Sequence, residues 1–162
     1  MVIRSDVMNG TLLPKAAIEE AEREGLIKVK GRKKVGVLSI DLHVKRLFRQ
    51  KVEGWVIGIS KACDEEAEED LFEEIHPKGD RWDLNPNGLY LAEAYETLEK
   101  RDGVVADIKS KSTWARYGLF QWTPIVEMRT PGEYKGKLEF LISPKTKVIL
   151  RKFDAPAHLF FA

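Results

Sequence analysis

The first part of the chain carries apolar residues at helical spacing. Ala17, Ile18 and Ala21 recur three or four positions apart, and glutamates occupy most of the positions around them. Pro14 suits the first turn of a helix, and Gly25 suits its end. The pattern therefore predicts a short surface helix of about ten residues between Pro14 and Gly25.

Beyond residue 35 the pattern changes to short runs of β-branched and aromatic residues between turn residues. Such runs cover 35–44, 55–59, 104–109, 137–142, 147–150 and 158–161. Segment 89–98 fits a helix or a strand on propensity alone, and the pairs Asn85-Pro86 and Asn87-Gly88 predict a turn before it. Many short strands with few helices predict a closed or sandwiched β fold. No repeat or linker interrupts the pattern, so we expect a single domain over residues 1–162.

Two charged runs stand out from this pattern. Segment 28–34 holds five cations in seven residues and predicts a solvated loop, although it could bind phosphate. Segment 64–74 is strongly acidic and predicts a mobile loop or an exposed helical turn. Diffuse acidic runs without glycine-punctuated ligand spacing seldom hold a cation tightly, so we predict no metal site in the chain.

Composition narrows the possible partners. The 27 Lys and Arg residues against 26 Asp and Glu give a net charge of +1, which offers no global attraction for nucleic acid. No apolar run approaches the roughly 18 residues of a membrane helix. Cys63 is the single cysteine, which excludes an intrachain disulfide and favours a cytoplasmic protein. Glutamine and asparagine are scarce while Glu, Lys and Arg abound, a pattern typical of heat-adapted proteins.

The densest chemistry lies just after the run at 104–109. Lys111, Ser112, Thr113 and Arg116 place two cations and two hydroxyls within about one helical turn, a set suited to phosphate. In a helix, Ser112 and Arg116 would share a face at spacing i, i+4. The alternative is a capped surface turn with Trp114 in the core and Arg116 in an ion pair.

This run also resembles a family motif. Residues 112–119, Ser-Thr-Trp-Ala-Arg-Tyr-Gly-Leu, resemble the Ser-Ser-x-Ala-Arg-x-Gly-Leu motif of the dCTP deaminase branch of the dUTPase superfamily. Three further segments resemble family elements in the same order. They are the early strand motif at 39–44 with Asp41, the aromatic-x-Gly hairpin at 134–136 with Tyr134, and the closing strand pair within 149–161 with His158. Ser5-Asp6 and residues 16–27 look like the family's N-terminal helix.

The resemblance implies a fold and an assembly. The fold is mainly β, a distorted jelly-roll β-barrel or dUTPase-like β-clip with a short N-terminal helix. The assembly is a homotrimer with nucleotide sites between subunits and Mg²⁺ bridging the triphosphate.

Residue roles can be carried over at the matched positions. Lys111, Ser112 and Arg116, with Thr113 beside them, would hold phosphates. Lys111 stands where the family usually has Arg, which keeps the charge but loses the bidentate fork. His158 stands where relatives often have Gln; it could hydrogen-bond a base or ribose, or be structural.

The resemblance also indicates a catalytic acid. Family deaminases use a Glu five residues after the hairpin Gly as a proton shuttle, and that position is Leu141 here. A two-residue deletion would instead bring Glu139 of Leu138-Glu139-Phe140 onto the family's Leu-Glu-Phe. Strand alternation places Glu139 on the same face as Leu141 in either case. Glu127, which precedes the hairpin, is the second candidate, and for both acids the alternative is an exposed carboxylate paired with a lysine.

Two departures leave other functions open. In dUTP-hydrolysing relatives an Asp before the hairpin positions the attacking water, whereas this chain offers Thr130 or Pro131 there. Family members also continue past the last strand into a segment that closes over the nucleotide, whereas this sequence stops at Ala162.

We therefore expect a dCTP deaminase that makes dUTP and ammonia. The alternatives are a dUTP diphosphatase that makes dUMP and pyrophosphate, and a silent nucleotide-binding homologue. A nucleic-acid-binding barrel that uses segment 28–34 is disfavoured, because no aromatic residues interleave its cations.

Overall fold

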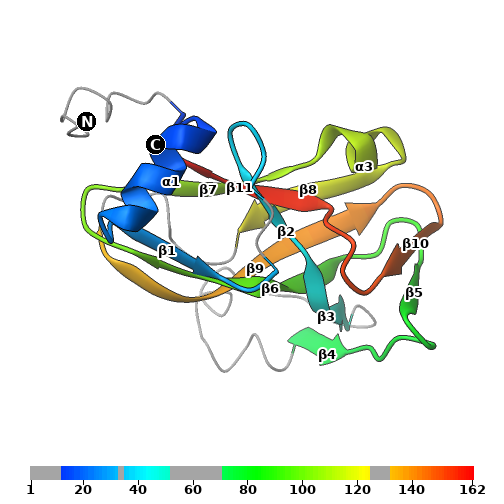
Figure 1. Ribbon diagram of the computed structural model, residues 1–162. Coiled ribbons are helices and arrows are strands. Elements are labelled where there is room, and N and C mark those ends of the chain that lie inside the picture. Colours follow the sequence, from blue (N-terminus) through cyan, green and yellow to red (C-terminus); the bar gives the residue numbers. More distant parts are fainter. Residues whose placement is uncertain (1–11, 33–34, 52–70, 125–131) are drawn as a thin grey trace.

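The structure is a computed structural model of the 162-residue chain, and it describes residues 12–32, 35–51, 71–124 and 132–162 (Figure 1). Its elements follow one another as α1 (Lys15–Arg23), β1 (Ile27–Lys30), β2 (Ile40–Leu42), β3 (Val44–Gln50), β4 (Phe72–Glu74), β5 (Arg81–Leu84), β6 (Tyr90–Lys100), β7 (Ala106–Ser110), α3 (Ser112–Arg116), β8 (Leu119–Pro124), β9 (Tyr134–Pro144), β10 (Val148–Arg151) and β11 (Ala157–Phe161).

Helix α1 forms where the apolar spacing predicts it. It begins directly after Pro14, whose φ of −71° and ψ of 165° are extended, and it buries Ala17, Ile18 and Ala21. Gly25, with φ of +72°, takes the left-handed conformation that ends the helix at low cost. Burial of Ile18 alone contributes about 2 kcal/mol, so packing rather than helix propensity holds this short element in place.

Strand β6 is the centre of a six-stranded sheet with the order β4-β3-β6-β9-β8, and β1 pairs with the second half of β6. On sequence propensity alone, segment 89–98 fits either a helix or a strand. It is a strand because antiparallel partners lie along both of its edges, namely β3 and then β1 on one side and β9 on the other. The turn predicted before it is also present, with Asn87 at a φ of +62°.

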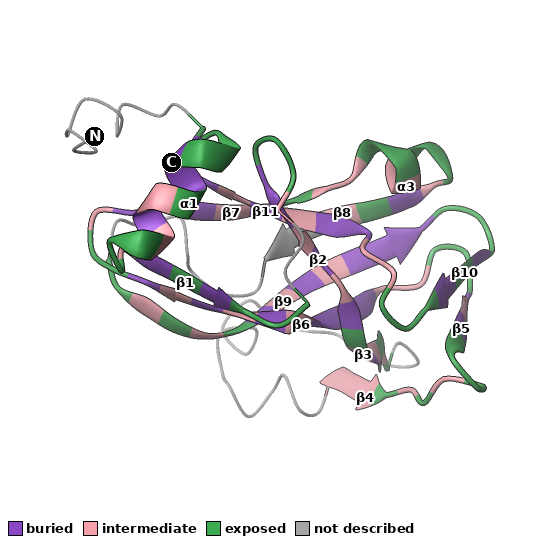
Figure 2. Cartoon of the chain, viewed as in Figure 1, coloured by how far each residue is buried: buried purple, intermediate pink, exposed green. Residues whose placement is uncertain are grey.

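A second layer covers this sheet. Strands β2, β11 and β7 form a three-stranded antiparallel sheet, and β10 pairs with β5 as a separate ribbon. The core joins both layers, because Ile40, Ile108 and Phe161 of the smaller sheet belong to the same buried cluster as Leu98 and Phe140 of the larger one. Figure 2 shows buried residues on the strands of both layers. The predicted mainly β fold with an N-terminal helix is confirmed.

A buried, hydrogen-bonded carboxylate fixes the corner where the chain passes from the smaller sheet to the larger one. His43 lies between β2 and β3, and its Nδ1 atom is 2.6 Å from Oε1 of Glu96. The other carboxylate oxygen of Glu96 accepts the backbone N–H of His43 at 2.8 Å. Glu96 is fully buried, so both contacts are needed to offset the desolvation of its charge.

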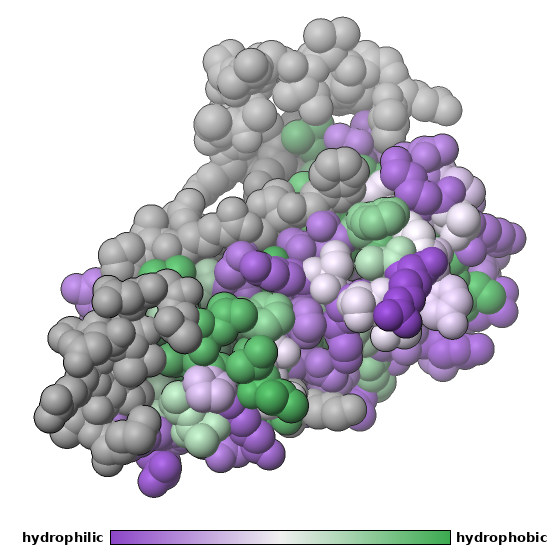
Figure 3. Space-filling view, turned by 90° about the horizontal axis from the view of Figure 1, so that it is seen from above, coloured by the Kyte–Doolittle hydropathy of each residue, from purple (hydrophilic) through white to green (hydrophobic). Residues whose placement is uncertain are grey.

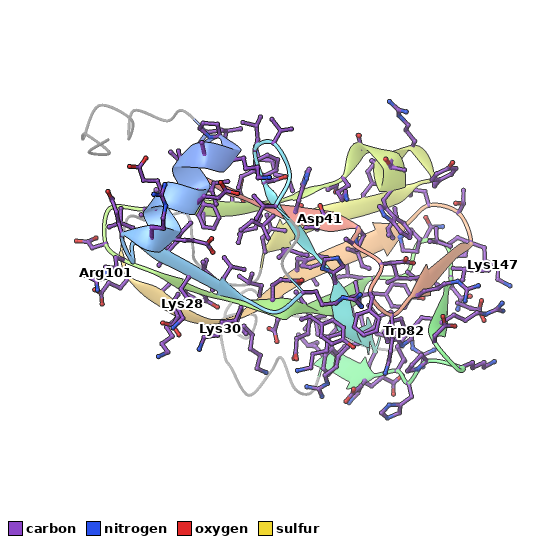
Figure 4. The ribbon with its side chains drawn as sticks, viewed as in Figure 1. Lys28, Lys30, Asp41, Trp82, Arg101 and Lys147 are labelled. Atoms are coloured by element: carbon purple, nitrogen blue, oxygen red, sulfur yellow. The ribbon has the colours of Figure 1, made fainter. Side chains whose placement is uncertain are left out.

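Three expectations from the sequence need correction. The solvated loop expected over residues 28–34 is wrong for Lys28 and Lys30, which belong to strand β1 and point outward from it (Figure 4). Their exposure suits an unpaired strand edge, where lysines oppose further pairing. The single run expected over 35–44 is divided at His43 between β2 and β3. The loop or helical turn expected for 64–74 is replaced at its end by β4, which pairs with β3. The run at 55–59 and most of the acidic segment lie outside the described residues.

Candidate functional site

Several candidate residues meet on the smaller sheet. Asp41 of β2 lies opposite His158 of β11, which in turn lies opposite Lys109 of β7. Lys111, just after β7, places its ammonium 3.0 Å from each carboxylate oxygen of Asp41. We call Asp41, Lys111, His158 and Ser39 the Asp41 cluster, and Figure 4 labels Asp41 on β2.

His158 in this cluster is poorly placed to carry a charge. Ser39 Oγ is 3.1 Å from its Nδ1 atom, and the ring of Phe160 packs edge-on against it at 4.5 Å. Burial and then the nearby charge of Lys111 lower the pKa of His158, and the opposing effect of Asp41 is smaller. The imidazole is therefore neutral at pH 7, and one ring nitrogen donates a hydrogen bond while the other accepts one.

Helix α3 follows this cluster directly and carries the remaining phosphate candidates. Ser112, Thr113 and Arg116 are exposed, and the helical spacing places Ser112 and Arg116 on one face, as predicted. The alternative of a capped turn does not match the structure in two respects. No side chain caps α3, and Arg116 makes no ion pair with any residue of the described ranges. Trp114 is half-buried against the core.

Glu139 lies in a different place, on the larger sheet. It lines a cavity of about 350 Å³, which we call the Glu139 cavity. Lys137, Glu139 and Leu141 share one face of β9, as strand alternation predicts. The lining combines an apolar set and a charged set: Phe48, Phe72 and Leu91, with Arg46, Glu74, Glu93, Lys137 and Glu139.

The strand register organises these charges into a row. Arg46 of β3 lies opposite Glu93 of β6, and Glu93 lies opposite Glu139 of β9. The side chain of Glu93 is only 5% exposed, whereas that of Glu139 is 22% exposed and thus open to a ligand. Lys137 Nζ lies 3.5 Å from Glu93 Oε2 and 4.0 Å from Glu139 Oε1.

Arg46 ties the edge strand β4 to this cavity. Its Nε and Nη2 atoms donate to the two oxygens of Glu74 at 3.0 and 2.7 Å, and its guanidinium lies 4.9 Å from the ring centre of Phe48. These hydrogen bonds lower the pKa of Glu74, so the carboxylate stays ionised. The acidic segment thus ends in a strand that closes one side of the cavity.

The sequence reasoning missed Arg46 and Glu93. One signal was present, since Glu93 is a lone acid within an apolar run, Tyr90 to Ala94, and an acid in such a run needs buried partners. The partners of Glu93 could not be predicted, because the pairings of β6 with both of its neighbours, β3 and β9, contain register shifts next to Glu93.

Tyr134 lies at the far end of β9. It lines a second cavity of about 670 Å³ together with Lys100, and its hydroxyl donates to the carbonyl of Lys137. Burial, with a contribution from the charge of Glu139, raises the pKa of Tyr134. Gly136 leaves room for this ring, since a Cβ there would lie 3.0 Å from the Tyr134 hydroxyl. Glu127, Thr130 and Pro131 lie outside the described residues.

In the described part of the chain, no group of three or more His, Cys, Asp or Glu side chains could hold a metal ion. In those same ranges no helix is long and apolar enough to cross a membrane.

Two solved structures share this arrangement of strands. The 2′-deoxycytidine 5′-triphosphate deaminase from Agrobacterium tumefaciens matches with a TM-score of 0.70 and 18% identity over 93% of this chain and 47% of its own. The EIAV dUTPase matches with a TM-score of 0.52 and 12% identity over 83% of this chain and 86% of its own. These matches establish a fold of the dUTPase and dCTP deaminase type. The chain spans about half the length of the deaminase.

The family follows from the sequence itself. A family model described as dCTP deaminase-like matches residues 12–161. The chain therefore belongs to the dCTP deaminase-like family, and the resemblance noted in its motifs is confirmed. A search of curated proteins found no match.

Proposed function

We propose that this protein deaminates dCTP to dUTP, with Glu139 as the residue that moves protons. The observation that carries the proposal is the position of Glu139: a partly exposed carboxylate at the wall of a cavity with two phenylalanines, in a chain of the dCTP deaminase-like family. The flat ring of a pyrimidine suits the apolar side of this cavity.

The reaction adds water and expels ammonia. The Glu139 carboxylate takes a proton from the water that attacks C4 of cytosine, and it delivers this proton to ring nitrogen N3. The C4–N bond then breaks, and the second proton of the water leaves with the amino group as ammonia. The balance is dCTP and water to dUTP and ammonia, and Glu139 ends in its starting state.

The phosphates belong with α3 in this proposal. Arg116 and the hydroxyls of Ser112 and Thr113 are exposed and suited to phosphate oxygens. Lys111 is already paired with Asp41, and its ammonium gains a second partner when phosphate binds. Any Mg²⁺ enters on the triphosphate and neutralises part of its charge.

The Glu139 cavity lies on the larger sheet, whereas the Asp41 cluster lies on the smaller sheet and α3 joins β7 to β8. For this reason we also propose a homotrimer with shared sites. In such an assembly α3 of one copy faces the Glu139 cavity of the next. Exposed apolar side chains support contact between copies: Val37 is 79% exposed, Tyr117 beside Arg116 is 70% exposed, and Phe120 is 41% exposed. Figure 3, which looks down on the side of α1 and α3, shows hydrophobic side chains gathered among polar ones.

Hydrolysis of dUTP is the second candidate, and the fold match to a dUTPase favours it. The two reactions differ in their products, ammonia for deamination and pyrophosphate for hydrolysis. The purified protein is incubated at elevated temperature with Mg²⁺ and either dCTP or dUTP, and both products are measured together with nucleotide binding.

The proposal is supported if the parent protein releases ammonia from dCTP and the Glu139→Gln variant does not. The matched control is Glu99→Gln, which removes a glutamate of β6 outside the Glu139 cavity. Release of pyrophosphate from dUTP, with no ammonia from dCTP, would favour dUTP hydrolysis over dCTP deamination. Binding without either product would indicate a silent homologue.

A further inference from the structure

Glu93 is a buried acid whose purpose the reaction above does not explain. It is 4% exposed between Ala92 and Ala94, in a strand whose other inward residues are apolar or paired. A carboxylate at this depth is costly unless cations offset its desolvation. Its Cα lies directly opposite that of Glu139, so two like charges occupy adjacent strands.

Three cations reach the Glu93 carboxylate. Lys45 Nζ lies 3.8 Å from Oε1, and Arg46 Nη1 and Lys137 Nζ lie 3.3 and 3.5 Å from Oε2. Lys137 is the one that Glu139 also attracts, at the longer distance of 4.0 Å. Glu93 therefore competes with Glu139 for the ammonium of Lys137.

We propose that Glu93 is a positioning residue that holds the Lys137 ammonium away from Glu139 and so keeps Glu139 basic enough to accept a proton. The inference rests on the proposed function for its catalytic meaning. A cation that closed on Glu139 would stabilise its ionised form and weaken it as a base. A nearby negative charge has the opposite effect, so Glu93 favours proton uptake by Glu139 in two ways.

Glu93 offsets part of the positive charge beside Glu139. Within the described part of the chain, the groups that face this region come from four strands: Lys137 and Tyr134 of β9, Glu93 of β6, Lys45 and Arg46 of β3, and Glu74 of β4. Arg46 is committed to Glu74 by two hydrogen bonds, and Tyr134 remains neutral because its pKa is raised. Lys137 has a side chain 63% exposed and already lies 4.0 Å from Glu139, so its ammonium can move toward Glu139 when Glu93 is neutralised.

The test is a titration of the Glu139 carboxyl carbon by NMR on protein labelled at glutamate carboxyl groups, with the signal assigned through Glu139→Gln. We expect Glu93→Gln to move the titration of Glu139 to lower pH by about one unit, the size of a typical single-charge effect. Glu99→Gln is the matched control, since Glu99 is also a β6 glutamate within 3.6 Å of a β9 lysine, Lys135, but lies outside the Glu139 cavity. It should leave the titration unchanged.

Lys137→Met provides a second variant, which an exposed site tolerates. It should move the Glu139 titration in the opposite direction, to higher pH. In the double variant the effect of Glu93→Gln should fall by more than half, because Glu93 acts mainly through Lys137. An unchanged titration in Glu93→Gln, an equal shift in Glu99→Gln, or an undiminished effect in the double variant would each overturn the inference.

Activity gives a separate readout. If the protein deaminates dCTP, the acid limb of its pH–rate profile moves to lower pH in Glu93→Gln, in step with the NMR titration. A shifted titration in a protein that releases no ammonia would contradict the proposed function while supporting the effect of Glu93 on Glu139.

Discussion

The Asp41 cluster and the Glu139 cavity differ in how their acidic side chains are paired with cations. In the first, Lys111 binds both oxygens of Asp41, and the pKa of His158 is lowered, so the cluster carries little net charge. In the second, Glu93 is almost fully buried among three cations, and the more exposed Glu139 has a looser contact with one of them. A cluster with paired charges suits the support of a phosphate site, whereas a partly exposed acid at the wall of a cavity suits proton transfer.

The largest effect should come from Glu139. We expect Glu139→Gln to reduce ammonia release from dCTP by about 10³-fold while nucleotide affinity stays within a factor of about two, because an amide cannot accept a proton. Initial rates and calorimetric binding measure the two quantities separately. Retained turnover would exclude Glu139 as the base and shift attention to Glu127.

The next largest effect concerns folding rather than chemistry. Glu96→Ala should lower the free energy of unfolding by about 3 kcal/mol, because it leaves His43 without the carboxylate that satisfies both its ring and its backbone N–H. Chemical denaturation measures the loss. Glu99→Ala, which removes a partly exposed acid from the same strand, is the control and should cost less than about 1 kcal/mol. Equal losses of free energy in Glu96→Ala and Glu99→Ala would show that the contact between His43 and Glu96 does not stabilise the fold more than a surface contact does.

A smaller effect concerns the affinity of α3 for the triphosphate. Arg116→Ala should weaken triphosphate binding about tenfold, the worth of one charge-assisted hydrogen bond, without changing stability. Arg23→Ala is the control, since Arg23 is likewise an exposed arginine in the last turn of a helix. Unchanged affinity for dCTP in Arg116→Ala would remove the phosphate assignment of α3.

The smallest effect is a pH dependence in the Asp41 cluster. The pKa of His158 is lower in the folded protein than its usual value of 6.5, so the unfolded state binds more protons. The contribution of His158 to the free energy of unfolding is therefore fully present above pH 6.5. It declines as the pH falls from 6.5 toward the pKa of His158 in the folded protein. Thermal unfolding between pH 5 and pH 8 should show this decline in the parent protein, by less than about 1.4 kcal/mol for each pH unit. His158→Gln should flatten it, and an unchanged slope would contradict the assignment.

Local patterns were sufficient for much of the fold. The spacing of Ala17, Ile18 and Ala21 predicts α1, and the alternation of Lys137, Glu139 and Leu141 predicts the cavity face of β9. Both rest on neighbours within a few residues, where helix and strand periods are reliable.

Contacts between distant segments could not be predicted in the same way. Lys111 and Asp41 are 70 residues apart, and their ion pair depends on β2 and β7 flanking β11. The row of Arg46, Glu93 and Glu139 depends on register shifts in two strand pairings, which local sequence does not specify. Segment 90–100 becomes a strand through its partners rather than through propensity.

The central claim is that the two regions serve one nucleotide from neighbouring copies, and a mixing experiment tests it most directly. Arg116→Ala and Glu139→Gln chains, each inactive or weakened alone, are unfolded together in equal amounts and refolded. If each site takes Arg116 from one copy and Glu139 from the next, about a quarter of the sites in random trimers are intact. Ammonia release, measured at dCTP concentrations well below KM so that the weaker binding of Arg116→Ala lowers its rate, then recovers to about a quarter of the parent rate. Activity no higher than the average of the two separate variants would contradict the shared site.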